Sequence, residues 1–480
     1  METVSCQGCR ERDARIAELE AKILELQSDP RVAKLEAKIL ELEGKLRDVI
    51  DKLKPPQPPR PSSDLPPGPD KKPTGRKRGG QPGHPPHLKQ LAPAERLKEV
   101  IRYIPEQCEH CQTKLSAEPG TNDPPPTRHQ VAELPKIVAE ITEYQVHSRT
   151  CSCCGKVTRA AIPAEITAHS VGPKLTGALS YFSGCHGVSK RGVEEITDAL
   201  FDAPISLGSV ANLEQEVSSA LVPAHKEATE AIKSAPIKHV DETGWKENGK
   251  KRWLWTAATF QVVAFIIHPR RGLKALQQLV GEQMAGILCS DRWRVYDNWD
   301  LFRRQLCWAH LKRNWEKQVE RGGAAKKLGD ACLKVQGQVF ELWHLFRGGG
   351  CTRADLKSRM VPLTEELHDI LLDAASRSRD RRLARFCTRI LDVYPALWTF
   401  VEEEGVEPTN NHAERVQRRA VIWRRRSFGC HSADGCRFVE RILTVVQSLR
   451  LQKRDVLTFL NDAIQAHRSG TTPPRLVPMG

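Results

Sequence analysis

The chain has 480 residues, with 74 lysines and arginines against 59 aspartates and glutamates and a formal net charge of +15. This length exceeds one ordinary hydrophobic core, so several domains are expected, and the positive balance favours a polyanionic partner, nucleic acid before membrane. The most apolar run, Val262 to Ile267, is far shorter than the roughly 20 residues that cross a bilayer, and the amino terminus has no apolar signal core, so we expect an intracellular protein without a membrane span.

Residues 1–53 are predicted to form a coiled coil. The segment "RIAELEAKILEL", Arg15 to Leu26, returns as "RVAKLEAKILEL", Arg31 to Leu42. In the second copy the apolar residues alternate in steps of three and four, which is typical of a coiled-coil seam. Self-association into a homo-oligomer is the favoured interpretation, and a helical hairpin or a solitary helix is the alternative.

Residues 54–90 are rich in proline, which removes backbone donors and blocks helix and sheet, so they are predicted to be an extended linker. The linker carries a basic cluster, Arg76, Lys77 and Arg78. Such a cluster either follows the phosphate backbone of DNA or is a solvated tether, and both interpretations stay open.

Residues 91–165 are predicted to be a small zinc-binding domain. In an intracellular chain, 15 cysteines indicate metal ligands and buried thiols before disulfides. Two pairs have the spacing by which a tight turn presents two thiolates to one zinc, and together they complete a tetrahedral structural site: Cys108, Cys111, Cys151 and Cys154. Between the pairs, Lys136 to Thr150 is rich in β-branched residues and is predicted to be a strand.

Other cysteines and histidines leave alternatives around this zinc site. Cys153 is expected to be a spectator, and His110 or His147 could replace one thiolate. The pair Cys6 and Cys9 lacks a second half, so it either binds metal across an oligomer or is free.

Residues 166–235 carry apolar residues at helical spacing and are predicted to form two or three helices. They are a candidate DNA-binding element or a plain helical spacer.

Residues 236–440 are predicted to be an α/β catalytic domain with a mixed sheet. The sequence Asn248-Gly249 is a strong hairpin signal between the first two strands. A helix over residues 272–286 separates a three-strand meander from two further strands. The five strands are expected at Ile237–Trp245, Arg252–Thr259, Val262–His268, Ile287–Cys289 and around Arg303–Leu311.

Three acids in this domain are candidate catalytic residues. Asp241 lies in the first strand and Asp291 ends the fourth, so placing these strands side by side would bring the carboxylates together. Such carboxylates repel unless a cation neutralises them, and their hard oxygens suit magnesium or manganese. Two such ions, ~3.5–4 Å apart, stabilise a phosphodiester displacement. The third acid, Glu414, is expected in the first turns of a helix capped by Thr409 or Asn410.

Each of the three acids could instead have a purely structural role. Other acids lie close by in sequence: Glu242 is next to Asp241, and Asp297 and Asp300 are near Asp291. The basic run Arg424, Arg425 and Arg426 with Trp423 is expected either to bind phosphates and stack on bases or to form a solvated helix face.

The segment "CWAH", Cys307 to His310, has ligand-like spacing, but a structural or site-orienting role is favoured over metal binding. A helical insertion is expected over residues 316–404, with one apolar stripe that packs into a core: Leu328, Cys332, Val335, Val339, Leu342 and Phe346. Residues 441–480 are predicted to be a carboxyl-terminal helical tail.

The motifs "HVDETGWK", "CSDRW", "QLCWAHLKRNW", "TNNHAER" and "AVIWRRRSFG" resemble the transposases of the insertion sequence 66 (IS66) family of bacteria. The resemblance covers nearly all of the chain from about Arg76 onward. It implies a ribonuclease-H-like core with a DDE triad, here Asp241, Asp291 and Glu414, behind a leading zinc-binding domain. It also implies the DNA ends of a mobile element as substrate.

We therefore expect a DNA transposase, cytoplasmic and nucleoid-associated, that cleaves element ends and joins the 3′-hydroxyl to target DNA with two Mg²⁺ or Mn²⁺ ions. Companion proteins of the same element are candidate partners. The alternatives are a zinc-containing DNA-binding regulator without catalysis, a structure-specific nuclease on the same core, and an inactive element remnant.

Overall fold

The computed structural model describes residues 14–22, 41, 91–118, 120 and 123–478. It divides into two units, Met1–Ala132 and Glu133–Gly480, each described by itself. Most of the predicted coiled coil lies outside the described residues; residues 14–22 form an exposed helix, and its pairing stays a prediction. The predicted linker lies outside them too, as do the following residues: Cys6, Cys9, Arg76, Lys77 and Arg78.

The described part of the first unit contains a short 3-10 helix, η1 (Ala94–Arg96), and a turn closed by a bridge between Gln107 and Lys114. The Gln130 side chain links two distant parts of this unit through the backbone of Ala92. Its Oε1 accepts from Ala92 N at 2.7 Å, and its Nε2 donates to Ala92 O at 3.1 Å.

The second unit begins with extended chain that leads to a small hairpin of β1 (Ser148–Thr150) and β2 (Val157–Arg159). The strand predicted over Lys136–Thr150 is therefore wrong except for its last three residues. The apolar side chains of this segment are exposed, for example Ile141 at 86%. Strand propensity acts through packing on a partner strand, and no described strand pairs with residues 136–147.

After α3 (Ala164–Thr167), the chain forms four helices up to residue 234, where two or three were predicted. They are α4 (Pro173–His186), α5 (Lys190–Phe201), α6 (Leu207–Ala220) and α7 (Val222–Ser234). Ser189 and Ser206 cap α5 and α6 by accepting from the backbone N–H three residues on. Ala224, Ala228 and Ile232 bury one face of α7 in the core under the sheet.

The sheet of the second unit has five strands in the order β5-β4-β3-β6-β7. Their bounds are β3 (Ile237–Glu247), β4 (Lys250–Ala258), β5 (Val263–His268), β6 (Ile287–Ser290) and β7 (Arg304–Leu306). β3, β4 and β5 are antiparallel, whereas β3, β6 and β7 are parallel, so the predicted α/β domain with a mixed sheet is confirmed. Asn248 and Gly249 both take positive φ, as the predicted tight hairpin requires.

Between β5 and β6 lies α8 (Leu273–Val280), and between β6 and β7 lie two 3-10 helices, η2 (Arg294–Asn298) and η3 (Leu301–Arg303). The fifth strand was predicted too long: it ends at Leu306, and Cys307 is the N-cap of α9 (Trp308–Arg321). The apolar run at residues 306–311 cannot distinguish a strand from a buried helix start.

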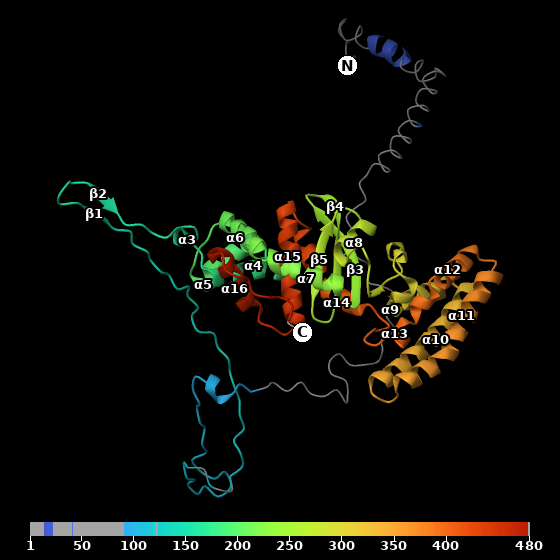
Figure 1. Ribbon diagram of the computed structural model, residues 1–480, viewed down its shortest axis with the longest axis horizontal. Coiled ribbons are helices and arrows are strands. Elements are labelled where there is room, and N and C mark those ends of the chain that lie inside the picture. Colours follow the sequence, from blue (N-terminus) through green and yellow to red (C-terminus); the bar gives the residue numbers. More distant parts are fainter. Residues whose placement is uncertain (1–13, 23–40, 42–90, 119, 121–122, 479–480) are drawn as a thin grey trace, which may run out of the picture. The chain divides into compact units, whose positions relative to one another are not determined.

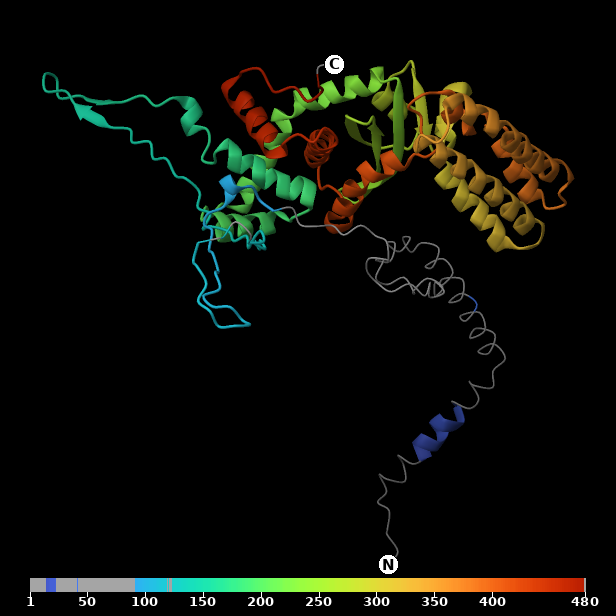
Figure 2. The same cartoon turned by 90° about the horizontal axis from the view of Figure 1, so that it is seen from below.

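The helical insertion follows as α9, α10 (Gly323–Arg347), α11 (Arg353–Arg377), α12 (Arg381–Leu391), η4 (Tyr394–Leu397) and α13 (Thr399–Glu402). Its predicted apolar stripe on α10 is confirmed, with Leu328, Cys332, Val335 and Val339 buried in a second core. Figures 1 and 2 show this insertion on the β7 side of the sheet, while α4, α5, α6 and α16 (Val456–Ser469) lie on the β5 side.

Two helices complete the domain, α14 (Asn411–Ser427) and α15 (Ala433–Leu451). α15 crosses the boundary at residue 441 that the sequence suggested, and it closes the β5 edge of the sheet. Val263 N donates to Ser448 Oγ at 2.9 Å, Phe265 N donates to Thr444 Oγ1 at 3.0 Å, and Ile267 N donates to Glu440 Oε1. One turn of α15 is about as long as two residues of β5. Side chains spaced one turn apart on α15 can therefore accept hydrogen bonds from alternate N–H groups at the edge of β5, which no other strand pairs with among the described residues.

Among the described residues, no helix combines the length and the apolar character needed to span a bilayer.

Candidate active site

Asp241 lies on β3, and Asp291 directly follows β6, the parallel neighbour of β3. The pairing of these strands runs in register up to His239 beside Cys289. Each aspartate follows its member of that pair by two residues, so the two carboxylates leave the sheet on the same face and at the same level. Asp291 accordingly adds repulsion to the ionised form of Asp241.

Helix α14 packs on β3 and β4 (Figure 1), on the face of Asp241, because its Gln417 contacts Thr256, the residue that pairs with Asp241. At its start, the Asn410 side chain donates to Val240 O at 2.7 Å. In its middle, Gln417 Nε2 donates to Thr256 Oγ1 of β4 at 3.2 Å, and near its end Arg424 donates to Thr243 Oγ1 at 3.0 Å. The helix is thus attached to the sheet at three levels.

The chain beyond α14 returns to β3. Cys430 N donates to Lys246 O at 2.9 Å, and the Cβ of any side chain at Gly429 would clash with that same carbonyl oxygen. Gly429 also has φ +108°, so the close approach requires glycine here.

Asn410 occupies the predicted N-cap position, but it makes no capping bond with its side chain. Instead its Oδ1 lies 3.1 Å from His239 Nδ1, and its amide nitrogen reaches β3. The predicted cap by Asn410 is therefore wrong in its chemistry: the side chain attaches the helix to the strand that carries Asp241.

Glu414 lies in the first turn of α14 and repels the ionised form of Asp241. Its Oε2 is 3.4 Å from Arg313 and its Oε1 is 3.6 Å from His310 Nε2. Oε1 is buried and has no hydrogen-bond partner among the described residues. The structure thus places Asp291, after β6, and Glu414, on α14, near enough to Asp241 on β3 for both to repel its ionised form.

The electrostatics of the cluster indicate a place for a cation. Burial, followed by the charges of Glu242, Asp291 and Glu414, raises the pKa of Asp241 to about 8. A carboxylate resists ionisation when it is desolvated among other carboxylates, and a divalent cation relieves both effects. The all-oxygen donor set and the unpartnered Oε1 of Glu414 fit a hard ion such as Mg²⁺ or Mn²⁺.

The neighbouring acids have partners built into the protein. Glu242 points to the opposite face of the sheet, where Arg271 Nε donates to its Oε1 at 2.8 Å and Tyr296 donates to its Oε2. Asp297 pairs with the buried Arg304 at 2.7 Å, and Asp300 caps η3 by accepting from Phe302 N at 3.0 Å. These three acids are therefore structural.

The three arginines predicted to bind phosphates differ in their exposure and in their partners. Arg424 is half-buried and committed to β3, whereas Arg425 and Arg426 are exposed. Arg426 also donates to His186 O at 2.9 Å. Trp423 stacks on Trp245 at 5.5 Å and donates to a backbone carbonyl, so it packs inside the molecule instead of offering its ring to bases.

Sequence reasoning missed two arginines. Arg415 and Arg418 are exposed and share one stripe of α14 with Arg425, starting beside Glu414. The signal was present, because positions 415, 418, 422 and 425 follow the helical repeat and are all exposed.

Both cysteine pairs form turns with the same hydrogen bonds. Cys108 N donates to Thr113 O at 2.9 Å, and Cys151 N donates to Lys156 O at 2.8 Å. The residue after each pair closes the turn onto the first cysteine's carbonyl. Hydrogen bonds, first from Thr113 and from the Cys154 backbone, lower the pKa of Cys111 and of Cys151 respectively, which favours thiolates. One zinc shared by the four cysteines stays a prediction.

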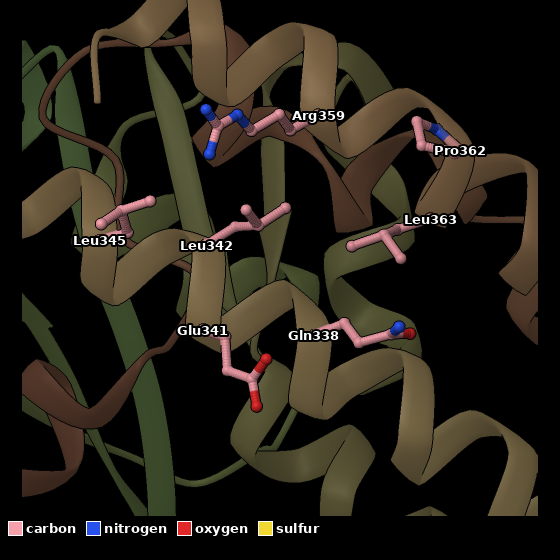
Figure 3. Close-up of a pocket in the computed structure, with 7 residues that line it drawn as sticks. All are labelled: Gln338, Glu341, Leu342, Leu345, Arg359, Pro362 and Leu363. Atoms are coloured by element: carbon pink, nitrogen blue, oxygen red, sulfur yellow. The ribbon is translucent and has the colours of Figure 1, made fainter. Parts of the chain in front are cut away.

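A shallow groove lies elsewhere, between α10 and α11 of the insertion (Figure 3). Leu342 and Leu345 line it from one helix, and Pro362 and Leu363 from the other. None of the predicted site residues borders it, so it has no part in the carboxylate site.

Two comparisons with known proteins found similar sequences. Residues 171–437 match the sequence model of the family described as "Transposase IS66 family". The chain is also similar to "Uncharacterized protein y4qI" of Sinorhizobium fredii, with 26% identity over 243 residues, which is 45% of this chain and 43% of that protein. The chain thus spans less than half the length of this relative. The family match contains all three acids of the carboxylate site.

Proposed function

The chain belongs to the IS66 family of transposases, and from this premise we propose that it is a DNA transposase of the DDE type. It would cleave the ends of an insertion element and join the freed 3′-hydroxyl to target DNA. The observation that carries this proposal is the convergence of Asp241, Asp291 and Glu414 on one face of the sheet, where Asp291 and Glu414 both repel the ionised form of Asp241.

The fold supports the assignment of a ribonuclease-H-like core. Three antiparallel strands are followed by two parallel ones, and a helix packs on the face that carries the acids. The acids come from the first strand, from the end of the fourth and from that helix. A regulator without catalysis would not need three carboxylates at one place, because their mutual repulsion disfavours the ionised form of Asp241.

Asp241, Asp291 and Glu414 would hold two divalent ions, Mg²⁺ or Mn²⁺. When bound, these ions supply Lewis-acid stabilisation of the attacking and leaving oxygens at a phosphodiester. The attachment of α14 at three levels keeps Glu414 in position for this task, since metal sites depend on ligands held within a few tenths of an ångström.

Two displacements of the same kind follow one another at this site. In the first, water attacks the phosphorus at the element end, the bond from phosphorus to the 3′ oxygen breaks, and a 3′-hydroxyl and a 5′-phosphate result. In the second, this hydroxyl attacks a phosphorus of target DNA and expels that strand's 3′ oxygen. The number of phosphodiester bonds is unchanged in the second step, so no ATP is needed.

The chain's own cations bind the DNA. Arg415, Arg418 and Arg425 form an exposed stripe on α14 that starts beside Glu414 and can contact successive phosphates. Arg313 pairs with Glu414 at 3.4 Å and is more than half exposed, so it is placed to contact the phosphate next to the cleaved one. The basic linker, the zinc site and pairing through the coiled coil remain proposals that accompany this function.

The test uses purified full-length chain, labelled DNA of the element ends and magnesium. Asp241→Asn should bind the ends with unchanged affinity and lose cleavage. Asp300→Asn is the matched control, because this exposed acid caps η3 and pairs with the exposed Arg303 at 3.9 Å, and asparagine caps equally well. Undiminished nicking by Asp241→Asn would remove the assignment. Cleavage without joining to a target plasmid would leave the structure-specific nuclease as the function.

A further inference from the structure

A second cluster of ligand atoms lies where α9 and α14 begin. Cys307, His310 and Glu414 each offer one ligand atom, and these atoms lie within 4.8 Å of one another. Cys307 is the N-cap of α9, His310 follows one turn later, and Glu414 lies in the first turn of α14. The proposed transposition chemistry uses Glu414 but neither Cys307 nor His310.

The two helix starts are held together by the backbone. Trp308 N donates to Pro408 O at 2.9 Å, and Asn410 N donates to Cys307 Sγ at 3.1 Å. Cys307 is only 2% exposed, so its sulfur has little freedom to move. The cluster is therefore formed before any ligand arrives.

Polar atoms in the cluster lack partners. His310 Nδ1 and Glu414 Oε1 are both buried without a hydrogen bond among the described residues. The 3.6 Å between His310 Nε2 and Glu414 Oε1 is too long for a hydrogen bond. Buried polar atoms normally have a hydrogen-bond partner or bind a metal ion. A bound cation would provide such a partner for the side chains of His310 and Glu414.

We propose that Cys307, His310 and Glu414 bind a zinc-class divalent cation, at a site separate from the all-oxygen magnesium site but sharing Glu414 with it. Thiolate and imidazole ligands select zinc or cobalt over magnesium, and three protein ligands leave one open position. On binding, the Cys307 thiol releases its proton and a sulfur–metal bond forms.

Burial raises the pKa of the Cys307 thiol above its usual value, although the backbone N–H groups of Asn410, His310 and Ala309 act in the opposite direction. The thiol form is therefore favoured without a cation. The same N–H groups, at the starts of α9 and α14, are in place to stabilise the anion once a cation displaces the proton.

This site has a consequence that rests on the proposed function. A zinc ion on Glu414 removes that carboxylate from the set shared with Asp241 and Asp291, so zinc should inhibit magnesium-supported cleavage. The site would then connect DNA cleavage to the supply of zinc.

The first test measures cobalt binding to the full-length chain by its thiolate-to-cobalt absorption and by equilibrium dialysis. The wild-type protein should bind one more equivalent of Co²⁺ than Cys307→Ser. His310→Gln, a conservative change at a partly exposed residue, should weaken that equivalent at least tenfold. Cys387→Ala, at a buried cysteine of α12, is the matched control and should keep it. Equal cobalt binding by wild type and both site variants would overturn the proposal.

The second test separates this site from the proposed catalysis. Asp241→Asn should retain the extra cobalt equivalent even though it does not cleave DNA, because Asp241 is not one of the three ligands. In cleavage assays, the zinc concentration that halves each protein's own zinc-free rate should be at least tenfold higher for His310→Gln than for wild type. Equal zinc sensitivity of the two proteins would overturn the inhibitory role. Absence of cleavage in every protein would contradict the transposase function alone, because the cobalt result does not depend on it.

Discussion

Asp241 and Glu242 are consecutive residues of β3, yet their carboxylates lie on opposite faces of the sheet and have different charged neighbours. On the face of Glu242, Arg271 and Tyr296 bind the carboxylate directly. Asp241 is instead repelled by Glu242, Asp291 and Glu414, and the nearby cation Arg313 pairs with Glu414 at 3.4 Å. One face thus pairs its acid directly with an arginine and a tyrosine, whereas Asp241 has no cationic partner among the described residues, and we propose that a divalent cation binds there.

The largest expected effect tests the unpaired face. Asp291→Asn and Glu414→Gln should each lower the rate of end cleavage by about a thousandfold or more, since each removes several kcal/mol of metal-dependent stabilisation. Single-turnover cleavage of labelled ends in magnesium measures this effect. Asp297→Asn, at an acid paired with Arg304, is the control and should retain most of the rate. A similar loss in all three variants would mean that the two kinds of acid do not differ.

Replacing Asp241 and replacing Glu242 should change the stability of the metal-free protein in opposite directions. Glu242→Ala leaves Arg271 without its partner and should destabilise the metal-free protein by about 3 kcal/mol. Asp241→Asn relieves repulsion and should raise the melting temperature of metal-free protein at pH 8.5. Thermal unfolding in a chelator measures both. Destabilisation by Asp241→Asn as large as that by Glu242→Ala would show that Asp241 is held by an internal partner.

Magnesium should stabilise the protein more at high pH. The pKa of Asp241 is raised to about 8, so its ionised form is disfavoured by the fold, and metal-free protein loses stability as pH rises toward 8. Below that pH an ion must displace a proton, so the rise in melting temperature caused by magnesium should be larger at pH 8.5 than at pH 6.5. Asp241→Asn should lack this pH dependence. An equal magnesium effect at both pH values in wild type would contradict the prediction.

The smallest expected effect concerns Glu440, an acid of α15 at the β5 edge of the sheet. Glu440 accepts from Ile267 N at the β5 edge, and burial raises its pKa to about 7. Because the neutral form is favoured in the folded state, the protein loses stability from this group as pH rises through 7. Glu440→Gln keeps an acceptor and should raise the melting temperature by about 2 °C at pH 8, with no gain at pH 4.5. Thermal scans at the two pH values check this, and Glu402→Gln at an exposed residue is the control.

Much of the domain was predictable because its signals are local. The hairpin at Asn248-Gly249, the strands around it and the apolar stripe of α10 follow from turn chemistry and from periodicity. Predictions failed where a segment's partner decides its state. Lys136–Thr150 has strand propensity without a described partner strand, and residues 308–311 were assigned to a strand although they begin α9.

The sequence by itself identified the candidates for the chemistry: the acids Asp241, Asp291 and Glu414, and the motif around Asn410. Only the tertiary structure decided which acids have strong internal partners, because Asp241 and Glu242 differ in their partners and not in their residue class. It also decided that Glu414 meets Cys307 and His310, which lie about a hundred residues earlier in the chain. Charge and spacing along the chain are local properties, whereas neutralisation and ligand geometry depend on contacts between residues far apart in sequence.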